Sequence, residues 1–269
     1  MGILDVQSVS KSFTKDKTGI EVLHDVSFSV DEEFVCIVGP SGCGKSTLLR
    51  IAAGLEHADS GQILFKGAPV VRPTPKIAMV FQLFGLLPWK TALENVMLPL
   101  EIGGLDVEAR RARAFEKLHD VELDGFENTY PHDLSGGMKQ RVGIARALAL
   151  HPDVLLMDEP FSSLDELTAK TLREMVLRIW RTPDPPNTFV MVSHNVEEAV
   201  LMADRVIVMS SRPGRIVGDV HVDIPRPRIQ HCRGDQYYSI VDEVVDFLEK
   251  GKAMPSVSNG TSEHAPTLS

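Results

Sequence analysis

The hydrophobic pattern at the start of the chain is that of strands leading into a helix. Apolar and polar residues alternate over 4–9 and 21–30, the period of exposed-edge strands with one face on a core. Residues 34–38 are apolar throughout, which is typical of a strand that is buried on both faces. A helical period then runs over 46–54. We therefore expect a buried strand, a short loop and a helix in direct succession.

The pattern changes twice beyond this helix. From 83 to 150 it is helical with Gly and Pro between the helices, which indicates a helical subdomain inserted into a larger domain. After it, strands and helices alternate, and strands that are joined by crossover helices form a parallel sheet. We thus expect an α/β fold with a mainly parallel sheet. The further strands are predicted at 62–66, 76–81, 154–157, 188–192 and 205–209, and the helices at 165–180 and 196–202.

The C-terminal part is expected to lie outside this sheet. Residues 216–224 predict two short strands around Gly218, and 236–249 an amphipathic helix. Its apolar side consists of Ile240, Val241, Val244, Val245 and Leu248. The tail is rich in Ser, Thr, Pro and Gly and is expected to be disordered. The predicted organisation is a main domain at 1–225, a helical extension at 226–250 and a tail at 251–269.

Composition and charge limit the classes of partner. The 269 residues are 43% hydrophobic and carry a net charge of −9, which argues against a surface that coats nucleic acid. No apolar run reaches the roughly eighteen residues that a membrane-spanning helix needs, and residues 1–20 do not read as a signal peptide. The three cysteines have no metal-ligand spacing, as is usual for reduced thiols. We therefore expect a protein of the cytoplasm.

One loop has the composition of a phosphate-binding site. Residues 39–47 read Gly-Pro-Ser-Gly-Cys-Gly-Lys-Ser-Thr and lie between the buried strand and the helix. Glycines let backbone N–H groups close around phosphate oxygens, and the positive end of the helix points at them. Lys45 is expected to reach the β and γ phosphates, and Ser46 to hold Mg²⁺. The predicted nucleotide contacts are Gly39, Ser41, Gly42, Cys43, Gly44, Lys45, Ser46 and Thr47.

Cys43 adds a chemical expectation to this loop. Its thiol would lie among inward-pointing amides at the start of a helix, where a thiolate is electrostatically favoured. We expect alkylation of the thiol to block nucleotide binding, and saturating ATP to protect it. For Cys36 and Cys232 we expect only a structural role.

A second segment supplies carboxylates. Four apolar residues at 154–157 precede Asp158 and Glu159, so that a buried parallel strand delivers both acids to the edge of the sheet where ligands bind. Asp158 is expected near Mg²⁺. Glu159 is expected to orient and deprotonate the water that attacks the γ-phosphate. Without the loop at 39–47, a strand that ends in an acidic turn would be an equally good interpretation.

A third segment, Ser135-Gly136-Gly137, begins a predicted helix. Serine in this position can be a plain N-cap. The two glycines leave backbone amides open at a helix N-terminus, which makes a second anion site for phosphates that already have one. We infer that this second site serves a nucleotide held by another copy of the chain.

Taken together, these motifs resemble the ATP-binding cassette (ABC) ATPases over residues 2–225. The loop at 39–47, Gln82, the stretch at 134–141, Asp158-Glu159, the stretch at 162–165 and Ser193-His194 occur in the family's order and roughly its spacing. The resemblance implies a P-loop NTPase core, an N-terminal antiparallel β subdomain, and a head-to-tail dimer that closes two ATP molecules between its subunits. Within one subunit, the resemblance implies that Gln82 senses Mg²⁺ and reports to a membrane partner, that His194 contacts the γ-phosphate and that Phe13 stacks on adenine. Across the dimer, it implies that Ser135 to Gly137 contact the nucleotide of the other subunit and that Asp165 bridges the two subunits.

Two of these positions have another interpretation or depart from the family. Phe13 is also explained by a core aromatic on a short strand. Glu32 stands where the family usually has a turn glycine, before the strand that enters the phosphate loop.

Finer features resemble the ATPases of bacterial nitrate, sulfonate and taurine importers. They are Gln82 to Trp89 with the stretch at 91–96, the stretch at 161–168, and the stretches at 194–199 and 210–215. The resemblance implies an integral-membrane permease and a periplasmic or lipid-anchored substrate-binding protein as partners, a second copy or paralogous ATPase, and a place on the cytoplasmic face of the membrane. Leu86, Leu87, Pro88 and Trp89 form an apolar stretch suited to a permease helix, or to the chain's own core.

Two other functions fit part of the pattern. A soluble ABC ATPase of translation, repair or chromosome handling would share the site, but such proteins usually carry two cassettes, long coiled coils or zinc insertions, which this sequence does not show. A P-loop kinase would explain the loop and the acids but not Ser135 to Gly137, Asp165 and His194 together. The chain is therefore predicted to be the ATPase subunit of an importer for a small anion.

Overall fold

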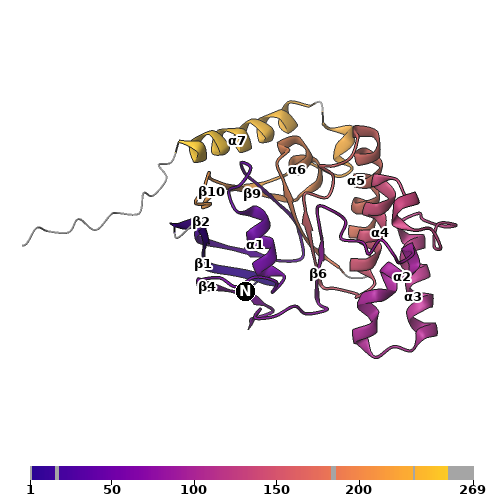
Figure 1. The fold of residues 1–269 in the computed structure, drawn as a ribbon. Coiled ribbons are helices and arrows are strands. Elements are labelled where there is room, and N and C mark those ends of the chain that lie inside the picture. Colours follow the sequence, from indigo (N-terminus) through magenta and orange to yellow (C-terminus); the bar gives the residue numbers. More distant parts are fainter. Residues whose placement is uncertain (1, 16–17, 183–185, 233, 254–269) are drawn as a thin grey trace, which may run out of the picture.

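The protein is described by a computed structural model that covers residues 2–15, 18–182, 186–232 and 234–253. It contains two sheets, with helices grouped beyond the larger one (Figure 1). The first sheet is antiparallel, in the order β2-β1-β4-β5. Its strands are β1 (Leu4–Lys15), β2 (Thr18–Val30), β4 (Ser60–Phe65) and β5 (Ala68–Pro69). Because β1 pairs on both sides, it is an interior strand, although its sequence pattern is that of an edge.

The second sheet has the order β10-β9-β3-β8-β7-β6. Neighbouring strands from β9 to β6 are parallel, and β10 runs antiparallel to β9. The strands are β3 (Phe34–Val38), β6 (Ile77–Val80), β7 (Val154–Asp158), β8 (Thr188–Ser193), β9 (Arg205–Met209) and β10 (Ile216–His221). This mainly parallel sheet beside an antiparallel one confirms the predicted fold class.

Alternation along the central strands divides the core in two. Val35 and Ile37 of β3 pack with α1 and the antiparallel sheet, whereas Phe34 and Cys36 pack with the helices on the other face. Both faces of the strand are buried, which is why its sequence is apolar without alternation. The helices are α1 (Lys45–Ala52), α2 (Ala92–Met97), α3 (Val107–Asp120), α4 (Gly136–Leu148), α5 (Glu166–Trp180), α6 (Val196–Met202) and α7 (Asp235–Lys252), with short 3₁₀ turns η1 (Leu98–Gly103), η2 (Pro131–Asp133) and η3 (Arg228–Gln230).

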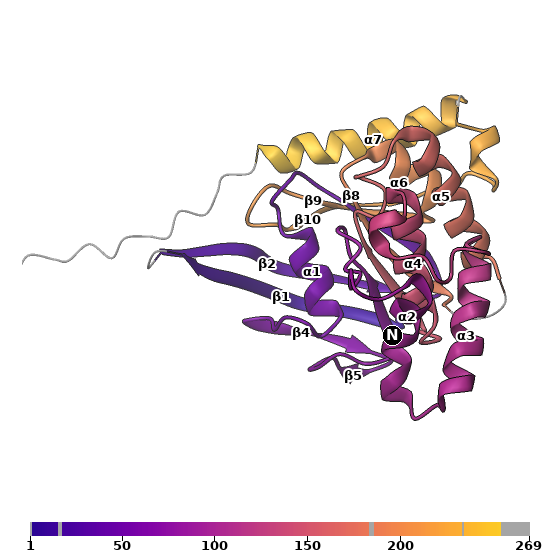
Figure 2. The ribbon, with the colours of Figure 1, turned by 45° about the vertical axis from the view of Figure 1, so that its right-hand side comes forward.

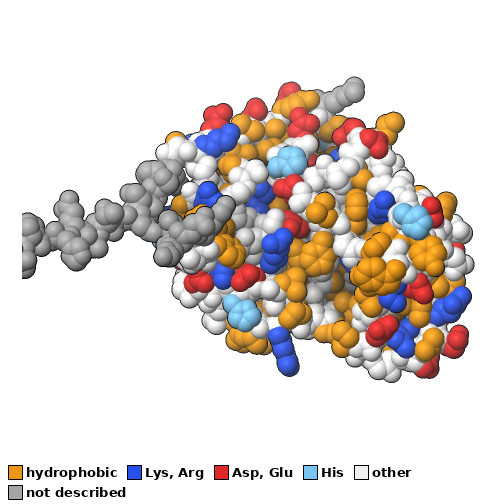
Figure 3. Space-filling model, in the orientation of Figure 1, with side chains coloured by type: hydrophobic (Ala, Val, Ile, Leu, Met, Phe, Trp, Pro, Cys, Tyr) orange, Lys and Arg blue, Asp and Glu red, His pale blue; other side chains and the backbone are white. Residues whose placement is uncertain are grey.

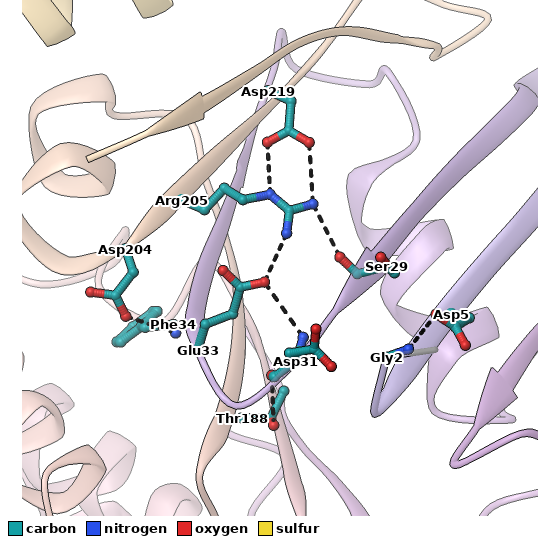
Figure 4. A network of polar contacts seen from close by, with 10 residues as sticks. All are labelled: Gly2, Asp5, Ser29, Asp31, Glu33, Phe34, Thr188, Asp204, Arg205 and Asp219. Atoms are coloured by element: carbon teal, nitrogen blue, oxygen red, sulfur yellow. Dashed lines mark hydrogen bonds and ion pairs between the residues drawn. The ribbon is translucent and has the colours of Figure 1, made fainter. Parts of the chain in front are cut away.

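The turn from β2 into β3 works without the glycine that the family usually has there. Glu32 lies between the two strands, and no residue of 31–33 has a positive φ. Arg205 of β9 instead fixes the turn, donating to Glu33 at 2.7 Å and to Asp219 of β10 at 2.7 Å (Figure 4). The hydroxyl of Thr188 donates to the Asp31 carbonyl at 2.9 Å. Side chains from three strands therefore set the entry of β3 into the sheet.

The C-terminal segment differs from its predicted form in three respects. Residues 216–221 form one strand, β10, whose pairing shifts register between Ile216 and Gly218, in place of two strands. The glycine interrupts the apolar pattern of this strand next to the register shift, which is why the sequence predicts two strands here. Val245 of α7 faces solvent, and Phe247 covers Gly218, where an added Cβ would meet its ring at 2.5 Å. Helix α7 also continues through Lys252, into the predicted tail, while 254–269 lie outside the described residues.

The helical region also begins later than its sequence predicts. Residues 83–91 form an irregular loop, and the first helix starts at Ala92, where Thr91 and Glu94 form a capping box. Phe84 and Gly85 both have φ of 59°, a left-handed conformation that a helix does not tolerate. In Figure 2 the helices α2 to α4 lie to one side of the sheets, and α7 runs along the top of the view, where it packs on α6, β9 and β10.

Candidate active site

The predicted site residues meet at one edge of the larger sheet. Parallel strands place their carboxyl ends on the same edge, which is where ligands bind in such sheets. The loop at 39–44 follows β3, Gln82 follows β6, Asp158 ends β7 and His194 follows β8. Strand register aligns these ends, because Val38 lies opposite Ser193 and Asp158 opposite Val192. The fold thus brings together segments that are more than a hundred residues apart in sequence.

The loop at 39–47 is held closely by its own chain. Lys45 is only 4% exposed, and its Nζ donates to the carbonyls of Gly39 at 2.8 Å and Pro40 at 3.1 Å. Gly44 has φ of 108°, and a Cβ there would meet Leu23 of β2 at 2.7 Å. This position therefore needs glycine for both conformation and space. The loop thus holds a buried ammonium beside the N-terminus of α1, and both features favour phosphate.

Cys43 does not behave as its sequence position suggests. The thiol is buried, not exposed to the loop, and burial raises its pKa, which outweighs the opposing effect of Lys45. Its Sγ also fills the space beside Gly39, where a Cβ would come within 2.9 Å. The expectation of a favoured thiolate was wrong, because the side chain points into the core while only its backbone belongs to the loop.

Ser46 and Asp158 form the candidate cation site. The Ser46 hydroxyl donates to Asp158 Oδ1 at 2.6 Å, so oxygens from α1 and β7 converge on one point. Burial raises the pKa of Asp158, and the hydrogen bond from Ser46 opposes that shift. Within the described residues there is no cluster of three or more His, Cys, Asp or Glu that would enclose a metal ion. The two oxygens fit Mg²⁺, which binds through one or two protein ligands and completes its shell with phosphate oxygens and water.

Glu159 and His194 face one another across the ends of β7 and β8. Glu159 Oε2 lies 3.1 Å from His194 Nδ1. The backbone of Glu159 has φ of 45°, unusual for a residue with a side chain, and its N–H donates to the Val192 carbonyl at 3.1 Å. This conformation turns the carboxylate away from the strand and toward the imidazole. A carboxylate and an imidazole thus face one another at the edge of the sheet that also carries the loop at 39–47.

Ser135 to Gly137 form a separate surface. Ser135 caps α4, accepting from the Met138 N–H at 3.3 Å, and in the described part of the chain no hydrogen bond joins the three residues to 39–47. Gly137 has a packing role that the sequence does not reveal, because a Cβ there would lie 2.4 Å from Thr168 Cγ2 of α5. Asp165 caps α5, and hydrogen bonds from Thr168 lower the pKa of its carboxyl.

Gln82 and Phe13 are the most isolated of the predicted residues. Gln82 is exposed and makes no hydrogen bond within the described residues, but the loop that follows it is fixed. Arg146 of α4 donates to the Phe84 carbonyl at 2.8 Å, and the amide of the buried Asn95 bonds Leu87 in both directions. Phe13 is 41% exposed on β1, so it is not a core aromatic, and the Nζ of Lys11 lies 5.2 Å from its ring centroid.

The α/β fold and the phosphate loop at its sheet edge define a P-loop nucleotide-binding protein. A model of the ABC transporter family matches residues 23–162. The aliphatic sulfonates import ATP-binding protein SsuB of Bacillus cereus is 38% identical over 92% of this chain and 96% of its own length. The nitrate import ATP-binding protein NrtD of Synechococcus elongatus is 39% identical, covering 92% of each. The dimeric cassette MJ0796, solved in a post-hydrolysis state with ADP and Pi, superposes with a TM-score of 0.73 at 33% identity, covering 82% of this chain and 100% of that one.

The chain therefore belongs to the ABC transporter family and is an ATP-binding ATPase of that family. This confirms the resemblance seen in the motifs. In the described part of the chain, no helix is long and apolar enough to cross a membrane.

Sequence reasoning missed the residues that support the site. Arg146 holds the loop after Gln82, and Arg173 of α5 is buried beside Glu198 of α6. Arg173 did have a signal, because it falls on the same helical face as the buried Ala169 and Val176. A cation at an apolar position of an amphipathic helix calls for a buried partner.

Proposed function

We propose that the chain powers an ABC importer for a small anion such as nitrate, a sulfonate or taurine. The observation that carries the proposal is the edge of the larger sheet, where the phosphate loop, the Ser46–Asp158 pair and the Glu159–His194 pair lie together. Relatives of nearly the same length that import sulfonates and nitrate support the direction and class of cargo.

In the proposed mechanism, ATP binds with its phosphates in the loop at 39–47, replacing the carbonyls of Gly39 and Pro40 as partners of Lys45. Mg²⁺ held by Ser46, Gln82 and Asp158 would offset phosphate charge. Glu159 takes the proton of the attacking water, and His194 orients the γ-phosphate beside it. Phe13 stacks on the adenine.

The second half of the site comes from another subunit. Ser135 to Gly137 and Asp165 of one copy, or of a paralogous ATPase, close over the nucleotide of its partner in a head-to-tail dimer. The exposure of Ser135 and Gly136 at the N-terminus of α4, away from their own chain's phosphate loop, supports this arrangement. ATP binding then favours the closed dimer, and hydrolysis releases it.

An apolar groove supports a permease as partner. A cavity of about 480 Å³ lies between the sheet and the helical region, and hydrophobic side chains gather on this face of the molecule (Figure 3). Its walls include Leu55, Phe81, Pro99, Leu100, Ile102 and Leu105. Ile102 is 87% exposed, and Trp89 lies exposed on the loop after Gln82. Leu86, by contrast, packs on the chain's own core. Such a groove fits a short helix of a membrane protein at the cytoplasmic face.

Purification of the tagged chain from gently solubilised membranes tests the proposal. We expect a stoichiometric multi-span permease, and with it a periplasmic or lipid-anchored binding protein whose ligands can be screened among nitrate, sulfonates and taurine. Ile102→Asp should lose the permease while the isolated chain keeps its ATPase activity. Tyr238→Asp, which changes a large exposed side chain on α7 away from the groove, is the control. Recovery of soluble partners or nucleic acid alone would contradict an importer and favour a soluble ABC ATPase.

A further inference from the structure

The residues next to His194 form a hydrogen-bond network with Glu198 of α6. Ser193, the residue before His194, is buried, and its hydroxyl donates to Glu198 Oε2 at 2.7 Å while accepting from the Asn195 N–H at 3.1 Å. The Glu198 N–H in turn donates to Asn195 Oδ1 at 3.1 Å. The position of His194 therefore depends on the Glu198 carboxylate through the residue that precedes it.

Arg173 of α5 holds the other oxygen of that carboxylate. Its Nη1 lies 3.1 Å from Glu198 Oε1, and its Nη2 lies 2.5 Å from Glu166 Oε1. Glu166 is the first residue of α5 and directly follows Asp165. One guanidinium thus joins the segment at 193–198 to the segment at 165–166. Arg173, Glu159 and His194 also line one cavity of about 160 Å³, so the guanidinium faces the same space as the candidate general base.

Burial makes this arrangement costly as a purely structural device. Arg173 is 9% exposed, and its Nε has no hydrogen-bond partner in the described structure. A buried ion pair rarely stabilises a fold more than apolar side chains of the same volume would, and the neighbouring positions of α5 that face the core are apolar. What the planar fork of arginine adds is geometry, because it holds the buried Glu198 carboxylate relative to Glu166, whose own side chain is exposed.

We propose that Arg173 is a positioning residue for ATP hydrolysis. It fixes the position of Glu198 relative to the Asp165–Glu166 segment. Through Glu198 it also fixes Ser193 and His194. The inference rests on the proposed role of His194 beside Glu159. The side-chain hydrogen bonds of Arg173 go to Glu198 and Glu166 and not to the loop at 39–47, so we expect Arg173 to affect the rate of hydrolysis and not ATP affinity.

The test uses paired variants of the full chain. Arg173→Met leaves a buried carboxylate unpaired, so Arg173→Met with Glu198→Gln removes both charges while an amide oxygen can still accept from Ser193. We expect this double variant to melt near the parent temperature, keep its KM for ATP, and lose about 10-fold to 100-fold in kcat, the scale of a small misplacement of a catalytic group. Arg173→Lys, with charge but no fork, should fall between. Lys170→Met, on the exposed side of α5, should match the parent.

A cycle with His194→Ala separates positioning from packing. If Arg173 acts through His194, the double variant with Arg173→Met and Glu198→Gln should slow the His194→Ala protein no further. Losses that multiply, or a parental kcat in that double variant, would overturn the proposal. If His194→Ala alone leaves kcat unchanged, the role of His194 in the proposed function fails, and the positioning proposal fails with it. That outcome is distinct, because it needs no Arg173 variant to be seen.

Discussion

The two segments that would hold phosphates differ in how completely one chain builds them. The loop at 39–47 is fixed from within, since Lys45 is buried against loop carbonyls and Ser46 bonds Asp158 across the sheet. The N-terminus of α4 has only the local cap of Ser135, and its neighbours on α5 serve to pack it. In the proposed head-to-tail dimer, the exposed start of α4 would meet the loop at 39–47 of a second copy, so each nucleotide site would need both subunits.

We expect the largest effect from a change of Glu159, the proposed general base. Glu159→Gln keeps the size of the side chain and an oxygen that can face His194, but it removes the base. Hydrolysis should fall about 10²-fold to 10⁴-fold, the usual contribution of general base catalysis, with ATP binding intact. Steady-state phosphate release and nucleotide titration of the same preparation measure both. Near-normal turnover would remove Glu159 from this role.

Lys45→Ala tests the loop itself. The variant removes the buried ammonium that is bonded to the carbonyls of the loop and is proposed to bind the phosphates. Losing a charge-assisted hydrogen bond should weaken ATP binding by about 10-fold to 100-fold. Calorimetry with ATP and with adenosine separates the causes, because adenosine has no phosphate for Lys45 to contact. An equal loss for both ligands would indicate a disrupted loop.

A mixture of two impaired chains tests whether the halves belong to different subunits. Ser135→Glu places a negative charge on the helix start, so homodimers of this variant and of Lys45→Ala are both expected to hydrolyse poorly. In a head-to-tail heterodimer, one site carries both changes and the other carries neither. Random pairing should then restore about a quarter of parental activity, since half the dimers are mixed and each has one intact site. Two affinity tags confirm that mixed dimers form, and their inactivity would refute the arrangement.

What the sequence predicted and what it missed follow from the range of the contacts. Strands such as β3 and β7 were predicted nearly to their ends, because burial on both faces leaves an uninterrupted apolar run. The phosphate loop was predicted because its chemistry is local. The direction of the Cys43 thiol was not, since it depends on core residues such as Met209 that lie far away in sequence. The contact of Arg173 with Glu198 was missed for the same reason, because Glu198 lies on another helix, α6, 25 residues further along the chain.

Gly137 offers a sharper comparison with its neighbour at the start of α4. An added Cβ at Gly137 would lie 2.4 Å from Thr168 Cγ2, whereas at Gly136 the nearest atom is Leu164 Cδ2 at 3.4 Å. Gly137→Ala should destabilise the protein by about 1–3 kcal/mol through overpacking. Gly136→Ala should be neutral or stabilising, because alanine favours the helix. Thr168→Ser removes the obstructing methyl group and should rescue Gly137→Ala in thermal unfolding. Unchanged stability with lost ATPase activity would mean that Gly137 serves the anion alone.

The smallest expected effect concerns the contribution of the Asp158 charge to stability. Asp158 is the carboxylate proposed to bind Mg²⁺. Burial raises the pKa of Asp158, so the folded protein binds that proton more tightly than the unfolded chain does. As pH rises above the unfolded value of about 3.9, the folded state must carry a charge that burial disfavours, and stability falls until the folded pKa is passed. Without nucleotide and Mg²⁺, Asp158→Asn should therefore melt above the parent at neutral pH, with the gain vanishing on acidification. Asp165→Asn is the control of opposite sign: hydrogen bonds lower the pKa of Asp165, and the stability it gives is present at neutral pH and lost as pH falls through the folded value. If both variants shifted alike at every pH, the charge of Asp158 would not be the cause.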